Sequence, residues 1–169
     1  MMIFRKATEQ DFNSIMEIIG QAQTYFKENQ IDRWQNQYPN PDIIKGDIEK
    51  GYANVLLDNN KVVATACISF DGEMNYETIY EGSWLWNGEY AVIQRLAVDQ
   101  TCKGKGLASE VIKNVESMCH EKGIKSIRVV THENNLAMQR VLNKNQFRHC
   151  GFILVAGAKR IAFEKILEF

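Results

Sequence analysis

The sequence predicts an α/β protein of mixed (α+β) character, with a twisted sheet of about seven strands flanked by about four helices. Segments with a strand pattern and segments with a helix pattern follow one another in the order β-α-α-β-β-β-α-β-α-β-β. Two strand–helix–strand units in the second half imply some parallel pairing, whereas short turns elsewhere imply antiparallel hairpins. We therefore expect a mixed sheet with helices on both faces.

The expected strands are short, rich in β-branched or aromatic residues, and bounded by turn residues. They are Ile3 to Ala7, Asn54 to Leu57, Val62 to Phe70, Tyr90 to Val98, Ser126 to Thr131, Phe147 to Val155 and Arg160 to Lys165. Asp58, Asn59 and Asn60 predict a tight turn between the second and third strands. The aromatic and acidic stretch from Asp71 to Asn87 has no clear period, so we expect a loop or an irregular strand there.

The expected helices have apolar residues at helical spacing and recognisable ends. They cover Thr8 to Phe26, Pro41 to Lys50, Gly104 to Glu121 and Asn135 to Lys144. Thr8 and Asp11 stand three residues apart, which predicts a capping box at the start of the first helix. Between the first two helices, Trp34 to Pro39 is expected to form an aromatic-rich loop.

Composition and charge fit a single globular domain over residues 1–169, with 45% apolar and 24% charged residues. The net charge of -1 gives no reason to expect nucleic acid or an anionic membrane as a partner. No run approaches the roughly 18 apolar residues of a spanning helix, and no signal-peptide pattern follows the first residues. We expect a cytoplasmic protein with four reduced, scattered cysteines and no metal site.

One segment has a pattern with chemical meaning: Lys103-Gly104-Lys105-Gly106-Leu107-Ala108, between an expected strand and an expected helix. A helix N-terminus presents amide N–H groups without intrahelical partners and a partial positive charge, and small residues let a ligand approach them. The lysines add positive charge, so the arrangement suits a phosphate or pyrophosphate. A plain strand-to-helix turn with solvated lysines is the alternative. The loop lacks the Ser or Thr of a nucleotide-binding P-loop and the third glycine of a dinucleotide fingerprint.

This segment resembles the signature of the GNAT family of N-acetyltransferases, Arg/Gln-x-x-Gly-x-Gly/Ala, with Lys103 at the Arg/Gln position. The resemblance extends over nearly the whole chain. Phe4-Arg5-Lys6-Ala7-Thr8 is similar to the family's first strand and helix start, and Leu96-Ala97-Val98 to the strand before the cofactor loop. Asn135, Met138, Leu142, Lys144 and Phe147 are similar to the family's later helix and the residues after it.

The resemblance implies an N-acetyltransferase that uses acetyl-CoA as co-substrate and acetylates a primary amine of a small molecule or protein by direct attack in a ternary complex. It implies that the pyrophosphate binds to backbone amides of Lys103, Gly104, Lys105, Gly106, Leu107, Ala108 and Ser109. Backbone groups of Leu96 and Val98 would pair with the pantetheine arm, and the Val98 N–H would stabilise the carbonyl oxygen. Asn135 would contact the pantetheine or the phosphates.

The sequence departs from the family at the proton-transfer residues. Many members have a tyrosine as general acid where this chain has Leu142, and Gln146 replaces the family's glycine before Phe147. The candidate proton donors that remain are Tyr76, Tyr80, Tyr90 or a water molecule. The general base is open too, with Glu89 as the first candidate ahead of Glu73, Glu77 and Glu81.

Trp34 and Tyr38 are candidate substrate-binding residues, as walls of an aromatic pocket for an amine, while ordinary loop packing is the alternative. We expect acetyl-CoA and an amine as partners and a homodimer as the default oligomeric state. Two other functions compete: a non-catalytic CoA-binding or regulatory module, and a toxin-like acetyltransferase of charged transfer RNA. The net charge of -1 counts against the second, because such a substrate calls for a basic patch.

Overall fold

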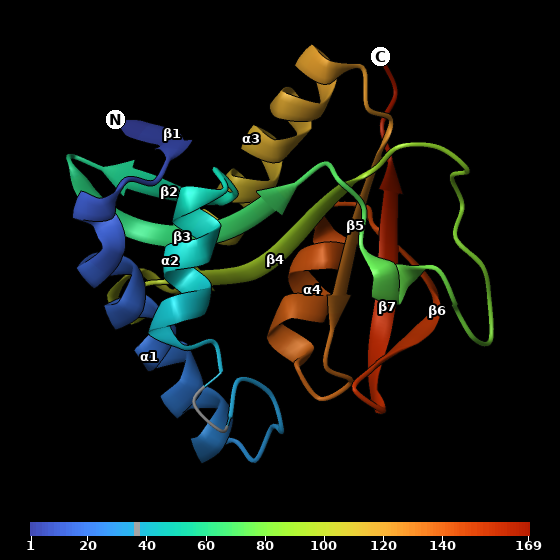
Figure 1. Cartoon of the computed structure of the whole chain (residues 1–169), viewed down its shortest axis with the longest axis horizontal. Coiled ribbons are helices and arrows are strands. Elements are labelled where there is room, and N and C mark those ends of the chain that lie inside the picture. Colours follow the sequence, from blue (N-terminus) through green and yellow to red (C-terminus); the bar gives the residue numbers. More distant parts are fainter. Residues whose placement is uncertain (36–37) are drawn as a thin grey trace. The chain divides into compact units, whose positions relative to one another are not determined.

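The computed structural model describes residues 1–35 and 38–169 and confirms the expected order of strands and helices (Figure 1). The strands are β1 (Met2–Lys6), β2 (Ala53–Asp58), β3 (Lys61–Ser69), β4 (Ala91–Val98), β5 (Ser126–Thr131), β6 (Arg148–Val155) and β7 (Ala158–Ile166). The α-helices are α1 (Phe12–Glu28), α2 (Pro41–Glu49), α3 (Leu107–Lys122) and α4 (Leu136–Lys144). Asn36 and Gln37, within the expected aromatic-rich loop, lie outside the described residues.

The strands form a mixed sheet, as the sequence predicts, and their order in the sheet is β1-β2-β3-β4-β5-β7-β6. β4 and β5 are parallel, whereas β1–β2, β2–β3, β5–β7 and β6–β7 are antiparallel. The expected β2–β3 turn is present, with positive φ angles of 51° at Asn59 and 69° at Asn60. Two successive residues in this conformation match the right-handed twist of a hairpin, and asparagine tolerates it well.

The chain divides into two compact units, each built from two separate segments. Unit 1 comprises residues 1–68 and 95–111, and unit 2 comprises residues 69–94 and 112–169. The chain therefore passes from one unit to the other three times, at the end of β3, inside β4 and inside α3. Whether residues 1–169 act as a single domain stays a prediction.

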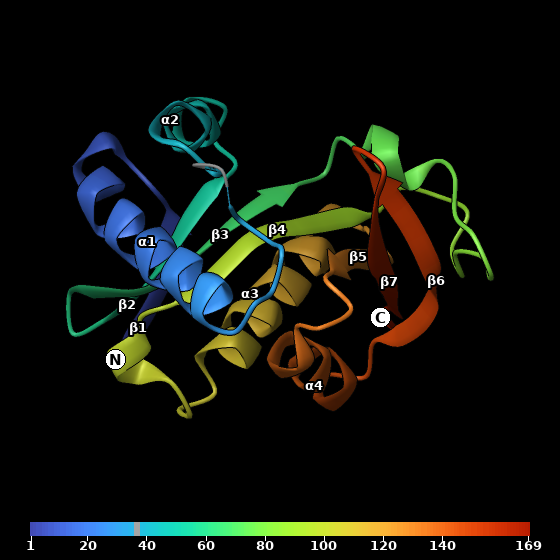
Figure 2. The same ribbon diagram turned by 90° about the horizontal axis from the view of Figure 1, so that it is seen from below.

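In unit 1, α1 and α2 lie on the same side of β2 and β3 (Figure 2). Ile15, Ile18 and Ile19 of α1 are buried against residues of α2 and β2, which is the apolar stripe expected from helical spacing. A short 3-10 turn precedes α1, and there the Asp11 carboxylate accepts a 2.8 Å hydrogen bond from the Thr8 backbone N–H. This contact confirms the predicted capping box.

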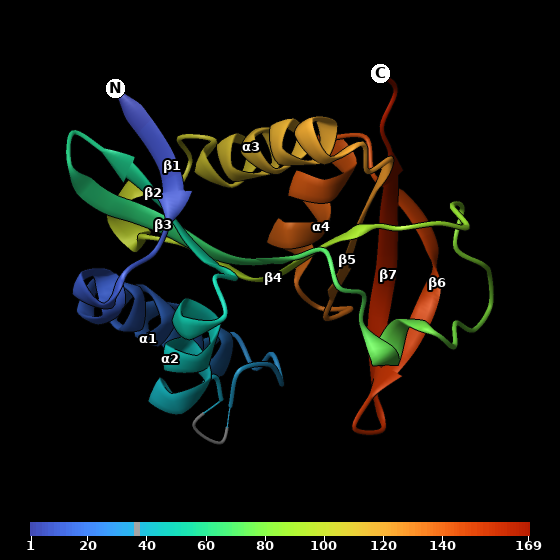
Figure 3. The ribbon, with the colours of Figure 1, turned by 45° about the horizontal axis from the view of Figure 1, so that its top comes forward.

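In unit 2, β6 and β7 run side by side, and the long β3–β4 connection packs against them (Figure 3). This connection is irregular, as expected, with a 3-10 turn at Met74–Tyr76. Tyr80 pairs with Phe152 of β6 through two backbone hydrogen bonds of 2.9 and 3.0 Å. The Trp84 indole N–H donates to the Tyr76 carbonyl at 2.7 Å, so the connection is fixed by its own contacts as well.

The start of α3 is the clearest error of the sequence analysis. The helix was expected from Gly104, but it begins at Leu107. Gly104 and Gly106 have φ angles of +82° and +73°, which belong to left-handed backbone and cannot continue a right-handed helix. The glycines therefore form the turn that precedes the helix.

Candidate active site

The predicted cofactor loop lies in unit 1 between β4 and α3. Asp99 stands at the start of this loop. Its Oδ1 accepts two hydrogen bonds from Thr101, one from the backbone N–H at 2.9 Å and one from the side-chain hydroxyl at 2.7 Å. The hydroxyl bond from Thr101 holds the pKa of the Asp99 carboxyl below its usual range. At Gly104 and Gly106 an added Cβ would meet no heavy atom within 4 Å, so open space lies beside the backbone at both positions.

The helical hydrogen-bond pattern of α3 begins just after the glycine turn. The bond from the Glu110 N–H to the Gly106 carbonyl, at 3.1 Å, is the one that opens the helical pattern. The N–H groups of the three residues before Glu110 precede this pattern, as in any α-helix. Lys103 and Lys105 are exposed beside them, and Lys103 Nζ lies 4.2 Å from the centre of the Tyr25 ring. Open space, the N-terminus of a helix and two cations make this loop suited to a phosphorylated ligand.

The backbone N–H and C=O groups near the end of β4 also point in defined directions. The Asp99 N–H donates to the Val63 carbonyl of β3 at 2.8 Å. Backbone groups alternate in direction along a strand, so Ala97 faces β3 as well, and the N–H and C=O groups of Leu96 and Val98 face the opposite edge. Backbone groups that face this edge are the ones with which an extended ligand, such as the expected pantetheine arm, can pair.

Arg95 is a special residue that the sequence analysis did not identify. Its φ of +51° interrupts β4, and such a conformation costs a residue other than glycine about 1–2 kcal/mol. Its side chain forms a bidentate ion pair with Asp47 of α2, with Nε–Oδ2 and Nη2–Oδ1 distances of 2.8 Å each. Nη1 donates to the Tyr38 hydroxyl at 3.1 Å, and Nη2 lies 3.4 Å from Cys67 Sγ. Burial raises the pKa of the Cys67 thiol to about 11, so the group beside Arg95 is a neutral thiol.

One sequence signal could have identified Arg95, since it is the single charged residue in the predicted strand from Tyr90 to Val98. A charge within an otherwise apolar strand needs a partner when it is buried. Its partner Asp47 is 48 residues away, and no spacing rule connects the two.

The two predicted acceptor residues occupy different environments. Tyr38 is 42% exposed and is held by Arg95 through its hydroxyl. Trp34 is 7% exposed and packs edge-to-face on Phe26 with ring centres 5.5 Å apart, which is the loop-packing alternative. Because Trp34 is almost fully buried, its position does not support a direct contact with an acceptor.

Asn135 and Glu89 belong to unit 2. Asn135 is buried and caps α4, with its Oδ1 accepting from the Met138 N–H at 3.3 Å. Glu89 is exposed in the stretch just before β4 rather than on the strand itself. Leu142, where the family has its acid, is fully buried in α4. The roles given to Asn135 and Glu89 stay predictions.

A buried carboxylate that the sequence analysis did not identify organises the same unit. Glu164 of β7 is inaccessible and accepts hydrogen bonds from Ser126 Oγ at 2.6 Å and Arg128 Nε at 2.9 Å. Its other oxygen accepts the backbone N–H groups of Leu85 and Trp86. With all these partners, Glu164 is a structural anchor for the end of the β3–β4 connection.

Arg128 completes this anchor. Its Nη2 donates to the Trp86 carbonyl at 2.6 Å. Its guanidinium carbon lies 4.3 Å from the centre of the Trp84 ring and 3.9 Å from that of Tyr90. The aromatic residues of the connection therefore surround a cation that is itself paired with Glu164.

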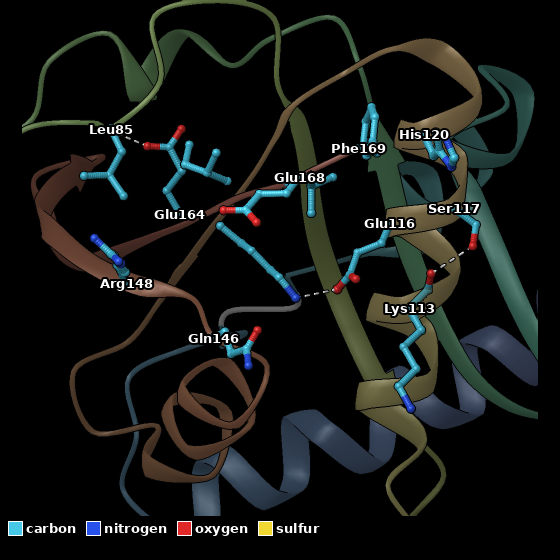
Figure 4. A pocket seen from close by; sticks show the side chains of 13 residues that line it. Leu85, Lys113, Glu116, Ser117, His120, Gln146, Arg148, Glu164, Glu168 and Phe169 are labelled. Carbon is cyan, nitrogen blue, oxygen red and sulfur yellow. Dashed lines mark hydrogen bonds and ion pairs between the residues drawn. The ribbon is translucent and has the colours of Figure 1, made fainter.

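Unit 2 contains a groove of about 1010 Å³, and none of the predicted site residues lines it (Figure 4). It runs between α3 and the end of β7, and the 3.0 Å ion pair between Lys165 and Glu116 crosses it. Its lining mixes both charges, including Arg148, Lys113 and Glu168. This mixture of charges differs from the loop after β4, where two lysines lie beside a glycine turn.

Residues 1–35 and 38–169 contain no helix with the length and apolar character needed to cross a bilayer. The same part of the chain has no group of three or more His, Cys, Asp or Glu residues placed to hold a metal ion.

The mixed seven-stranded sheet with four helices is the architecture of acetyltransferases. The acetyltransferase (GNAT) family model matches residues 13–147, and the chain belongs to this family. It is accordingly an N-acetyltransferase, as the sequence resemblance implied. A search of the curated proteins found no match to the sequence.

Solved structures show the same fold over the whole chain. A GNAT-family acetyltransferase from Streptococcus agalactiae is 32% identical, with a TM-score of 0.92, over 99% of this chain and 96% of that one. A putative acetyltransferase from Staphylococcus aureus is 24% identical, with a TM-score of 0.73, over 98% and 99%. The PaiA N-acetyltransferase of Thermoplasma acidophilum, in complex with coenzyme A, is 15% identical, with a TM-score of 0.73, over 98% and 99%.

Proposed function

We propose that this enzyme transfers the acetyl group of acetyl-CoA to a primary amine of a small molecule or protein, by direct attack in a ternary complex. The observation that supports it best is the open, left-handed glycine turn at Gly104 and Gly106, directly before the N-terminus of α3 at Leu107. A diphosphate carries negative charge that the amides of this N-terminus and the adjacent lysines neutralise. The coenzyme A complex of the T. acidophilum enzyme gives this choice of ligand further support.

The residues of unit 1 fit the cofactor in two places. Amides from Lys103 to Ser109 would hold the pyrophosphate, with the charges of Lys103 and Lys105 beside it. Leu96 and Val98 would pair with the pantetheine arm, because their backbone groups face away from β3. From unit 2, Asn135 is proposed as a further contact to the pantetheine or phosphates.

Bound acetyl-CoA supplies a thioester whose carbonyl carbon the amine attacks. Since an alkyl amine has a pKa near 10.4, it must first lose a proton at neutral pH. We assign Glu89 as the base that takes this proton, directly or through water, because it is exposed just ahead of β4. The Val98 N–H is assigned to the carbonyl oxygen, where negative charge develops.

The departing thiolate needs little assistance, since a thiol with a pKa near 8.5 is a good leaving group. Leu142 offers no proton, and its full burial keeps water away from that position. A missing tyrosine at this position is therefore compatible with turnover.

The test has two measurements on the wild-type chain. Titration with coenzyme A should give binding heat and a higher melting temperature. Release of free thiol from acetyl-CoA should then depend on an added amine, using spermidine, tyramine and a lysine-containing peptide as acceptors. Binding without amine-dependent thiol release would support the non-catalytic module instead, and no binding at all would refute the assignment.

A separate variant tests the proposed base. Glu89→Gln should lower kcat by about 100-fold if Glu89 is the base.

A further inference from the structure

Tyr38 is held in place by contacts at both its backbone and its side chain. Its carbonyl accepts a 2.9 Å hydrogen bond from Gln23 Nε2 of α1, and its N–H donates to the Gln35 carbonyl at 3.1 Å. Its hydroxyl accepts from Arg95 Nη1 at 3.1 Å. Even so, 42% of the residue is exposed. An exposed aromatic residue held this firmly presents a fixed group to the solvent.

Arg95 presents two different edges to its neighbours. The edge formed by Nε and Nη2 is occupied by the Asp47 carboxylate, while Nη1 faces Tyr38. Both charged side chains are largely buried, with 14% of Arg95 and 11% of Asp47 exposed. The planar, bidentate geometry fixes the guanidinium more firmly than a single contact would. The direction of the Arg95–Tyr38 bond is therefore set by Asp47.

The position of this cluster along β4 links it to the reaction, an argument that rests on the proposed function. With the pyrophosphate at the loop after β4, an arm that runs back along the strand meets Val98 first, then Leu96, and then the interruption at Arg95. The Val98 N–H, which is assigned to the reacting carbonyl oxygen, thus lies three residues along β4 from Arg95. Tyr38, Arg95 and Val98 all belong to unit 1, so the hydroxyl that Arg95 holds lies in the same compact unit as the proposed reacting carbonyl.

The space behind the ion pair is too small for a substrate. The cavity lined by Asp47, Cys67 and Arg95 measures about 10 Å³, which is close to what one water molecule needs. An amine therefore reaches this cluster from the solvent side, where Tyr38 is exposed.

We propose that the Tyr38 hydroxyl binds the acceptor amine, and that Arg95 and Asp47 are positioning residues that hold this hydroxyl in place. The phenolic oxygen has two lone pairs, of which one accepts from Arg95 and the other accepts an N–H of the amine. The cationic edge of Arg95 disfavours a second positive charge at this oxygen, so the uncharged, nucleophilic form of the amine is preferred.

The test compares three variants with wild type, using the panel amine that wild type acetylates fastest. Tyr38→Phe removes one neutral hydrogen bond and should raise the acceptor KM about fivefold, while the acetyl-CoA KM and the melting temperature stay unchanged. Arg95→Lys keeps the positive charge but loses the bidentate geometry of the guanidinium, so it should raise the same KM and also lower the melting temperature. In the double variant the acceptor KM should be no higher than in Tyr38→Phe, because Arg95 acts through Tyr38.

Arg5→Lys is the matched control, because Arg5 forms another bidentate pair in unit 1, with Asp11 at 2.7 and 3.1 Å. It should lower the melting temperature without changing the acceptor KM. An unchanged acceptor KM in active Tyr38→Phe, or multiplied effects in the double variant, would overturn this inference alone. A wild-type chain that binds coenzyme A but acetylates none of the amines would overturn the proposed function, and this inference with it.

Discussion

Replacing Gly106 by alanine separates the conformational role of this glycine from its role in binding. A methyl group at its φ of +73° costs about 1 kcal/mol in stability, which is a decrease of about 2–4 °C in Tm for a chain of this size. The methyl group meets no protein atom within 4 Å, so the rest of the fold is unaffected. If the diphosphate lies in that space, it must move away and lose a charge-assisted hydrogen bond. The loss of about 2 kcal/mol weakens coenzyme A binding about 30-fold.

Gly157 provides the matched control for this experiment. It lies in the β6–β7 turn with a φ of +80°, and an added Cβ would again meet nothing within 4 Å. Gly157→Ala should lower Tm by a similar amount and leave coenzyme A binding unchanged. Calorimetric titration and thermal melts of the two variants give both quantities. Equal affinities of Gly106→Ala and Gly157→Ala for coenzyme A would refute the placement of the diphosphate.

Three further predictions concern charge. Glu164→Ala leaves Arg128 buried without its carboxylate, so urea unfolding should show a loss of about 3–5 kcal/mol. The hydrogen bond from Arg5 holds the pKa of Asp11 below its usual range, so the ionised carboxylate stabilises the fold above about pH 4, and this contribution is lost as the pH falls further. Melts from pH 7 to 3 should therefore show a smaller acid-side decrease for Asp11→Asn than for wild type, and equal decreases would contradict the assignment. Lys105→Ala should weaken coenzyme A binding a few-fold at low salt and far less at high salt, because this exposed charge is screened; a salt-independent loss would contradict a purely electrostatic role.

The order of elements was predictable because it depends on local periodicity. The stripe of Ile15, Ile18 and Ile19 repeats at helical spacing, and the paired asparagines at the β2–β3 turn have a strong local preference. The start of α3 was predicted wrongly for a related reason. Glycine allows both helical and left-handed backbone, so Gly104 alone did not reveal which one the chain adopts.

Contacts between distant segments were not predictable in the same way. The loop from Lys103 to Ala108 could be predicted as a candidate site because its pattern is contiguous in sequence, and its role stays a prediction. In contrast, Asp47 meets Arg95 and Arg128 meets Glu164 only once the strands and helices are assembled. A buried acid such as Glu164 looks like an ordinary surface residue in the sequence, since its partners come from two other segments, the β3–β4 connection and β5.

The interleaved make-up of the two units has a consequence for dissecting the protein. Neither unit is a continuous stretch of chain, and two of the crossings fall within β4 and α3 rather than in loops. A fragment that stops after Ile68 lacks the rest of its own unit, residues 95–111. Expression of half-length pieces would therefore yield incomplete folding cores, and functional mapping of this enzyme requires point substitutions in the intact chain.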